Sequence, residues 1–307
     1  MKLLQLYLPL IILVLSGFVL GSKLPATVPL YLGQFLFWVG VPLSIMAFLR
    51  QADLSGAIWV APVIAWIAVF LGAGLAWVWI NWQSNRKTVV NSWSRPTQGS
   101  FILAAMAGNT GYLGYPVTLA FVGTQYFGYA LFYDLLGTTL AVWGLGVVIA
   151  AAYGGGVKSQ WQLLKKVAIN PSLWSFGAGL LFRQVPLSTL LETSLQTLGW
   201  AIVALSLILI GMRLRQLNSW HSLPKASISL SIKMLVVPLL LGSILSLFGI
   251  TGAAKLAIVL QMAMPPAFAT LVIAEVYNLD RDLSVTALAV GSGGLLVTLP
   301  IWLWIFS

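Results

Sequence analysis

The 307-residue sequence contains no cysteine, one histidine and only six acidic residues. The absence of thiols excludes disulfides, thiolate metal sites and cysteine nucleophiles. Neither an HExxH nor a GxSxG pattern occurs, and His221 falls in a basic stretch where a solvated loop residue is expected. The sequence therefore predicts that the protein is not an enzyme and carries neither a cofactor nor a metal.

Charged residues are also scarce, at 7% of the chain, whereas 60% of the residues are hydrophobic. Soluble domains carry about 25% charged residues, so a soluble fold of this composition would have no polar surface. The formal charge of +10 does not indicate nucleic-acid binding, because the basic residues occur singly or in twos beside apolar runs. Long apolar runs in lipid form helices rather than barrel strands. The sequence predicts an all-α membrane protein.

A membrane-spanning helix needs roughly 20 apolar residues, and ten hydrophobic runs of that kind are expected. The first is interpreted as a span rather than a cleaved signal peptide, because its apolar part fills a whole span. The runs lie near residues 3–20, 31–49, 57–81, 98–122, 126–152, 168–183, 189–212, 227–248, 253–275 and 284–306. They divide five and five, which predicts a first five-helix repeat (1–152), a linker (153–167) and a second five-helix repeat (168–307).

The basic residues indicate which side of the membrane is cytoplasmic. Of the 16 lysines and arginines, four fall on the side of the two termini and twelve fall on the opposite side. Short cytoplasmic loops carry the excess of positive charge. The sequence therefore predicts a multi-pass cell-membrane protein with both termini outside and the basic loops, including the linker, in the cytoplasm.

Each half has its most Pro/Gly-disrupted hydrophobic segment in its fourth span, around Pro116 and around Pro265 and Pro266. Because five is odd, the second repeat enters the membrane upside down. This predicts two inverted five-helix repeats with broken, crossing helices 4 and 9, although a merely kinked structural helix is the alternative for each segment. At 1.5 Å per residue, Asn109 lies about 16 Å and Pro265 about 18 Å deep, so both breaks fall near the midplane. Paired broken segments of this kind indicate a transporter binding site.

Half-helices that begin after such breaks present free backbone N–H groups and a positive dipole end, which favour an anion. The Asn109 amide can both donate and accept, so it can orient a carboxylate or a hydroxyl. The candidate substrate-binding residues are Asn109, Thr110, Gly111, Pro116, Pro265 and Pro266.

Asp134 lies about 14 Å into the fifth span and is the one acid at mid-depth. A carboxylate at that depth is costly unless it is paired with another group, hydrated or protonated. Three roles remain open, namely a hydrogen-bond partner for groups freed by the break, a proton-coupling site, and a shielded bystander or sodium ligand. Lys233 is expected within about 11 Å of the inner face, to which its side chain can extend. Gly17 and Gly21 form a small-xxx-small pair suited to close helix packing.

Four segments resemble the auxin efflux carrier family, which includes PIN-like and malate permease-like transporters of the bile acid/arsenite/riboflavin transporter superfamily. They are GNTGYLGYP (108–116), YDLLGTTL (133–140), MPPAFATLVIAEVYNLD (264–280) and TLPIWLW (298–304). The resemblance implies ten spans in two inverted repeats, a scaffold of spans 1, 2, 6 and 7 that usually dimerises, and a moving unit of the other six spans. It also implies transport of organic anions, with the crossing contacting the carboxylate.

The leading functional hypothesis is a secondary transporter, with efflux as the direction, for a small organic anion such as a carboxylate or an auxin-like acid. It would work by elevator-type alternating access as a homodimer in the lipid bilayer, with proton coupling among the options. The alternative is a channel or a solute-sensing receptor built on the same bundle. A receptor normally needs a soluble output domain, and a channel favours a ring of like charges or filter residues.

Overall fold

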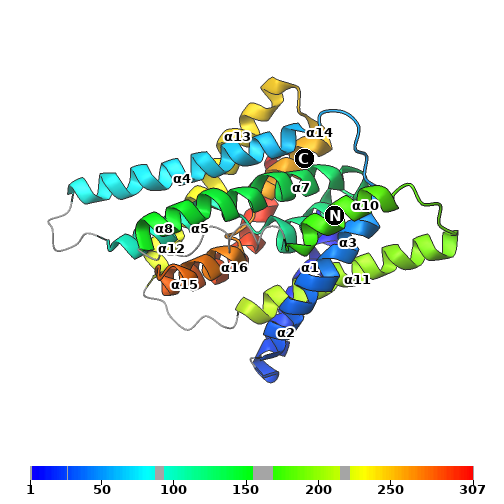
Figure 1. The fold of residues 1–307 in the computed structure, drawn as a ribbon, viewed down its shortest axis with the longest axis horizontal. Coiled ribbons are helices and arrows are strands. Elements are labelled where there is room, and N and C mark those ends of the chain that lie inside the picture. The colour runs from blue at the N-terminus through cyan, green and yellow to red at the C-terminus, as the bar shows by residue number, and fades with distance from the viewer. Residues whose placement is uncertain (1, 26, 87–92, 155–168, 215–221, 307) are drawn as a thin grey trace.

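The computed structural model describes residues 2–25, 27–86, 93–154, 169–214 and 222–306, and within these ranges the chain is helical apart from short connections (Figure 1). Their only β pairing is an isolated antiparallel bridge between Gly108 and Pro266. Most of the expected linker 153–167, and His221, lie outside the described residues.

The helices follow one another in two sets. The first comprises α1 (Lys2–Lys23), α2 (Thr27–Phe35), η1 (Leu36–Gly40), α3 (Val41–Leu49), α4 (Val60–Arg86), α5 (Arg95–Met106), η3 (Thr110–Gly114), α6 (Tyr115–Phe121), η4 (Thr124–Tyr126), α7 (Phe127–Phe132), η5 (Tyr133–Thr139), η6 (Val142–Gly146) and α8 (Val147–Gly154). The second comprises α10 (Pro171–Phe182), α11 (Thr189–Leu214), α12 (Leu223–Ser231), η7 (Ile232–Val236), α13 (Val237–Leu245), η8 (Ser246–Phe248), α14 (Gly252–Met262), α15 (Phe268–Val276) and α16 (Arg281–Phe306). The η elements are π-helical except η4 and η8, which are 3₁₀.

Within the described residues, six helical runs are long and apolar enough to cross a membrane. These are Thr27–Leu49, Val60–Ser84, Thr124–Gly154, Thr189–Arg213, Leu223–Phe248 and Arg281–Phe306. Two of the other expected spans do not qualify because each is interrupted, into α5 and α6 and into α14 and α15. The chain is thus an all-helical integral membrane protein, while the count of ten and the inverted repeat remain predictions.

Helices α1 and α11 pack backbone to backbone through glycines. A Cβ atom added at Gly17 would lie 2.0 Å from the carbonyl oxygen of Ile208, and one at Gly211 would lie 1.9 Å from that of Val14. Gly21 approaches Met212 in the same way. Glycine is needed here because any side chain would push the two helices apart.

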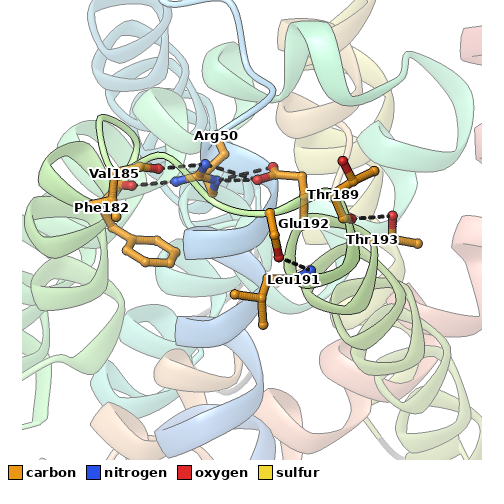
Figure 2. Close-up of polar contacts among 8 residues, drawn as sticks. Arg50, Phe182, Val185, Thr189, Leu191, Glu192 and Thr193 are labelled. Atoms are coloured by element: carbon orange, nitrogen blue, oxygen red, sulfur yellow. Dashed lines mark hydrogen bonds and ion pairs between the residues drawn. The ribbon is translucent and has the colours of Figure 1, made fainter.

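The ends of α3, α10 and α11 are held together by Arg50, the residue after α3 (Figure 2). Its guanidinium forms an ion pair with Glu192 of α11, with 3.0 Å between Nη2 and Oε2. It also donates to the carbonyl oxygens of Phe182 (2.5 Å) and Val185 (3.0 Å), which close the C-terminal end of α10. Together with the glycine contact, this cluster joins α1, α3, α10 and α11 into one group.

A second group contains α4, α5, α8, α12, α13, α15 and α16, and Figure 1 shows most of it on the opposite side of the molecule from α1, α2, α3 and α10. Its core includes fully buried Phe101, Tyr133 and Trp302. Helices α6 and α7 lie between the two groups and meet α3 and α11 through a separate apolar cluster that includes Phe48, Leu131 and Leu207. The two groups therefore meet largely through apolar side chains.

Candidate functional site

The interruptions of the two broken helices meet and hydrogen-bond to each other, and we call this contact the crossing (107–109 and 263–267). The Asn109 N–H donates to the Pro265 carbonyl oxygen at 2.7 Å, and the Ala267 N–H donates to the Ala107 carbonyl oxygen at 3.0 Å. The bridge between Gly108 and Pro266 lies between these two bonds. Backbone N–H and C=O groups without hydrogen-bond partners are costly in a bilayer. At the crossing, each interruption supplies hydrogen-bond partners for backbone groups that the other interruption leaves free.

Two helices end at the crossing and two begin there. Helices α5 and α14 end, whereas η3 begins at Thr110 and α15 begins at Phe268. A helix start leaves its first backbone N–H groups without intrahelical partners and carries a partial positive charge. Two positive helix ends therefore converge beside the paired interruptions.

Asn109 caps the start of η3. Its Oδ1 atom accepts from the Tyr112 N–H at 3.3 Å, which leaves the amide Nδ2 group as a donor without a partner among the described residues. The side chain is half-buried. Asn109 is thus placed to hold the crossing with one end of its amide and to donate to a bound group with the other.

The other sequence-predicted residues lie at different points of this arrangement. Thr110 and Gly111 occupy the first turn of η3, with Thr110 buried and Gly111 half-buried. Pro265 and Pro266 belong to the crossing and are buried. Pro116, by contrast, lies in helical backbone just after the junction of η3 and α6. The break in this half therefore precedes Pro116 by seven to nine residues.

Asp134, on η5, is buried with only 7% of its surface exposed, and three hydroxyl groups donate to its carboxylate. Thr110 Oγ1 (2.5 Å) and Thr139 Oγ1 (3.3 Å) reach Oδ1, and the Tyr115 hydroxyl reaches Oδ2 at 2.7 Å. Gly111 leaves room for this carboxylate, since a Cβ there would lie 3.1 Å from Oδ2. Asp134 therefore binds η3 and α6 to η5 directly behind the Asn109 cap.

Lys233, on η7, points into the crossing. Its ammonium donates to the Met262 carbonyl oxygen at 2.7 Å, at the end of α14, and lies against Gly108, where a Cβ would be 3.1 Å from Nζ. The residue is 3% exposed. The expectation that Lys233 extends to the inner face is therefore wrong, because packing turns its side chain toward the negative end of a broken helix.

Arg213, in the last turn of α11, is the second cation beside the crossing. Its guanidinium stacks on the ring of Phe268, the first residue of α15, with Cζ 4.3 Å from the ring centre. It also covers Gly33 of α2, where a Cβ would lie 2.6 Å from Nη2. From the sequence, Arg213 is one of the twelve basic residues expected on the cytoplasmic side, and no motif connects it with the break.

Three of the polar groups around the crossing lie on π-helical segments. Thr110 is on η3, Asp134 on η5 and Lys233 on η7. A π-helical turn widens the helix and frequently marks a functional site. Within the described residues, no three His, Asp or Glu side chains gather as metal ligands do.

Paired broken helices inside an apolar helical bundle are typical of integral membrane proteins that transport solutes. A family model described as "Membrane transport protein" matches residues 3–303. The chain belongs to this family, and the resemblance to auxin efflux carriers is confirmed.

Two archaeal proteins are similar to this chain. An uncharacterized transporter of Methanothermobacter thermautotrophicus is 32% identical over 304 residues, covering 96% of this chain and 95% of that protein. An uncharacterized transporter of Methanocaldococcus jannaschii is 28% identical over 212 residues, covering 67% of this chain and 68% of that protein. The family and these relatives indicate a membrane transporter rather than an enzyme.

Proposed function

We propose that the protein is a secondary carrier, in the efflux direction, for a small organic anion such as a carboxylate or an auxin-like acid, which binds at the crossing. One observation carries the proposal: two positive helix ends and the cation Arg213 converge beside the crossing, where Asn109 offers a free donor. Helix N-termini and arginine both favour anions. The direction of transport is adopted from the family resemblance.

In the proposed architecture, ten spans form two inverted five-helix repeats, 1–152 and 168–307, and dimerise through the α1, α3, α10 and α11 group. Two features support elevator-type movement of the second group against the first. Helices α3 and α11 meet α6 and α7 through a cluster of apolar side chains, where sliding breaks few polar contacts. In addition, Tyr112 of η3 packs against an apolar cluster of the first group that comprises Leu36, Ile202 and Leu209, so this contact is apolar as well.

For Asp134 we propose the structural role, because its carboxylate is already engaged by hydroxyls from Thr110, Tyr115 and Thr139. A carboxylate turned toward these donors does not repel an anion as strongly as one facing the site. Proton coupling through Asp134 is the competing proposal. The variant Asp134→Asn, which cannot take up or release a proton, separates the two proposals.

Binding by purified protein across mono- and dicarboxylates and indole acids tests the proposed substrate class. Asn109→Ala should weaken binding of the best acid about tenfold or more, because a hydrogen bond to a charged group contributes about 1.5 to 3 kcal/mol. Folded Asn109→Ala protein with unchanged affinity would show that Asn109 does not contact the substrate.

Movement of the two groups can be tested with paired cysteines, since the chain has none of its own. Phe48→Cys combined with Phe127→Cys joins α3 to α7, whose rings at these positions lie 5.8 Å apart, when treated with a short thiol crosslinker. The crosslinked protein should lose transport and regain it on reduction, while each single variant stays active. Undiminished transport by fully crosslinked protein would exclude elevator movement at this interface.

A further inference from the structure

Arg213 carries a charge that no acidic side chain of the chain neutralises. All six acidic residues of the chain lie in the described ranges, and none of them pairs with Arg213. Glu192 pairs with Arg50, and Glu275 pairs with Arg281. The other acids include Asp134, which is engaged by hydroxyl groups.

The guanidinium is nevertheless partly enclosed by neighbouring helices. Arg213 is half-buried, packed between Gly33 of α2 and the ring of Phe268. Tyr112 of η3 lies within electrostatic range. A charged side chain in a transmembrane segment is expensive and marks a functional site unless a partner neutralises it. Stacking on an aromatic ring stabilises only part of that charge.

The N–H donors of the guanidinium remain available. Its central carbon lies over the Phe268 ring, and this contact does not require any of the five N–H groups. No described residue accepts a hydrogen bond from them. Because Phe268 is also the first residue of α15, these donors lie beside the positive end of that helix. A fork of two parallel N–H groups matches the two oxygens of a carboxylate.

We propose that the Arg213 guanidinium binds the carboxylate of the transported solute at the crossing, and that Arg213 thereby selects acids over their neutral analogues. This inference rests on the proposed function and adds a specific anchor to it. The ligand class is an organic acid with at least one carboxylate, held bidentately by Arg213 and bordered by the Phe268 and Tyr112 rings. Because α11 belongs to the first helix group and Phe268 to the second, the bound acid bridges the two.

The test compares acids with their amides, which have the same shape without the charge. Indole-3-acetate with indole-3-acetamide, and malonate with malonamide, are measured for binding to wild-type, Arg213→Gln and Arg281→Gln proteins. Arg281→Gln is the matched control, because it removes an arginine charge at an exposed site with 62% of its side chain accessible. Arg213→Gln should weaken acid binding about tenfold or more and leave amide binding unchanged, whereas Arg281→Gln should change neither.

If Arg213→Gln does not fold, two further variants test the role of Arg213. Gly33→Ala places a methyl group against Nη2 and displaces the guanidinium without removing it. Arg213→Lys keeps the charge but loses the bidentate fork. Both should reduce acid binding several-fold and leave amide binding unchanged.

The possible failures are distinguishable. Folded Arg213→Gln protein that keeps the wild-type preference for acids overturns the role of Arg213 and leaves the carrier proposal standing. If Arg213→Gln is unfolded, unchanged acid affinity in both Gly33→Ala and Arg213→Lys overturns it equally. Wild-type protein that binds no acid, or binds amides as well as acids, contradicts the proposed function itself and the Arg213 inference with it.

Discussion

Asp134 accepts from three hydroxyl groups, and replacing it tests whether that cluster holds the crossing together. Asp134→Leu removes the acceptor while nearly preserving side-chain volume, so the hydroxyls of Thr110, Tyr115 and Thr139 lose their partner. A buried donor left without an acceptor costs about 1 to 3 kcal/mol. Thr110 and Tyr115 are buried and Thr139 is partly buried, so we expect a loss of about 3 kcal/mol, which is a large part of the stability of a typical protein.

Asp134→Asn should be far milder. The amide keeps one acceptor oxygen, hydroxyl groups can turn to accept from its NH₂ group, and the substitution removes a buried charge. We expect a loss within about 2 kcal/mol for this variant. If the role of Asp134 is structural, Asp134→Asn protein also keeps full substrate accumulation with an unchanged pH dependence.

The assay is thermal unfolding followed by tryptophan fluorescence in detergent, for which the 14 tryptophans supply the signal. Asp134→Leu should lower the midpoint by about 6 °C or more and Asp134→Asn by clearly less. Tyr115→Phe should cost about 1.5 to 3 kcal/mol in the wild-type background and less in the Asp134→Asn background. Tyr133→Phe is the matched control, because this buried neighbour makes no hydrogen bond to Asp134.

Two outcomes would refute the structural role. Equal midpoints for wild type and Asp134→Leu would mean that the hydroxyl cluster contributes nothing to stability. A stable Asp134→Asn protein that no longer accumulates substrate against a gradient would instead assign proton coupling to Asp134.

Four further predictions concern other parts of the protein. Lys233→Met removes a buried charge that has no acidic partner, so the unfolding midpoint should stay the same or rise. The affinity for acids should fall several-fold, and a large loss of stability would contradict this prediction. Arg50→Ala should cost about 2 kcal/mol, since one partner stays partly exposed, and an unchanged midpoint would exclude a stabilising role. Gly211→Ala forces a methyl against α1 and should cost about 1 to 3 kcal/mol, whereas Gly177→Ala, with open space around it, should not. Finally, Ser159→Cys in intact cells should resist an impermeant maleimide, and labelling from outside would reverse the predicted orientation.

The sequence was sufficient to locate the two breaks, because glycine and proline interrupt helices through local chemistry. The segments 108–116 and 264–267 carry that chemistry, and the interruptions occur at 107–109 and 263–267. It also suggested the contact through Gly17 and Gly21, since small residues four apart lie on one helix face. Both are local properties that a single chain segment displays.

The charges around the crossing could not be assigned in this way. The depth of Lys233 or Arg213 follows from counting residues along a helix, but the direction of the side chain depends on how that helix is rotated against its neighbours. Both were therefore interpreted as belonging to the inner membrane face. For Asp134, the sequence did contain a hint: Thr139 is five residues later, a spacing that the π-helical turn of η5 brings onto one face.

Counterflow in proteoliposomes tests most directly whether the protein is a carrier. Vesicles containing the purified protein are loaded with the unlabelled acid that binds best, and uptake of the same labelled acid is followed over time. An alternating-access carrier exchanges bound substrate, so the labelled acid should transiently accumulate above its external concentration, and Asn109→Ala vesicles should accumulate much less. Uptake that only equilibrates, with no stimulation by internal acid, would indicate a channel and contradict the proposed mechanism.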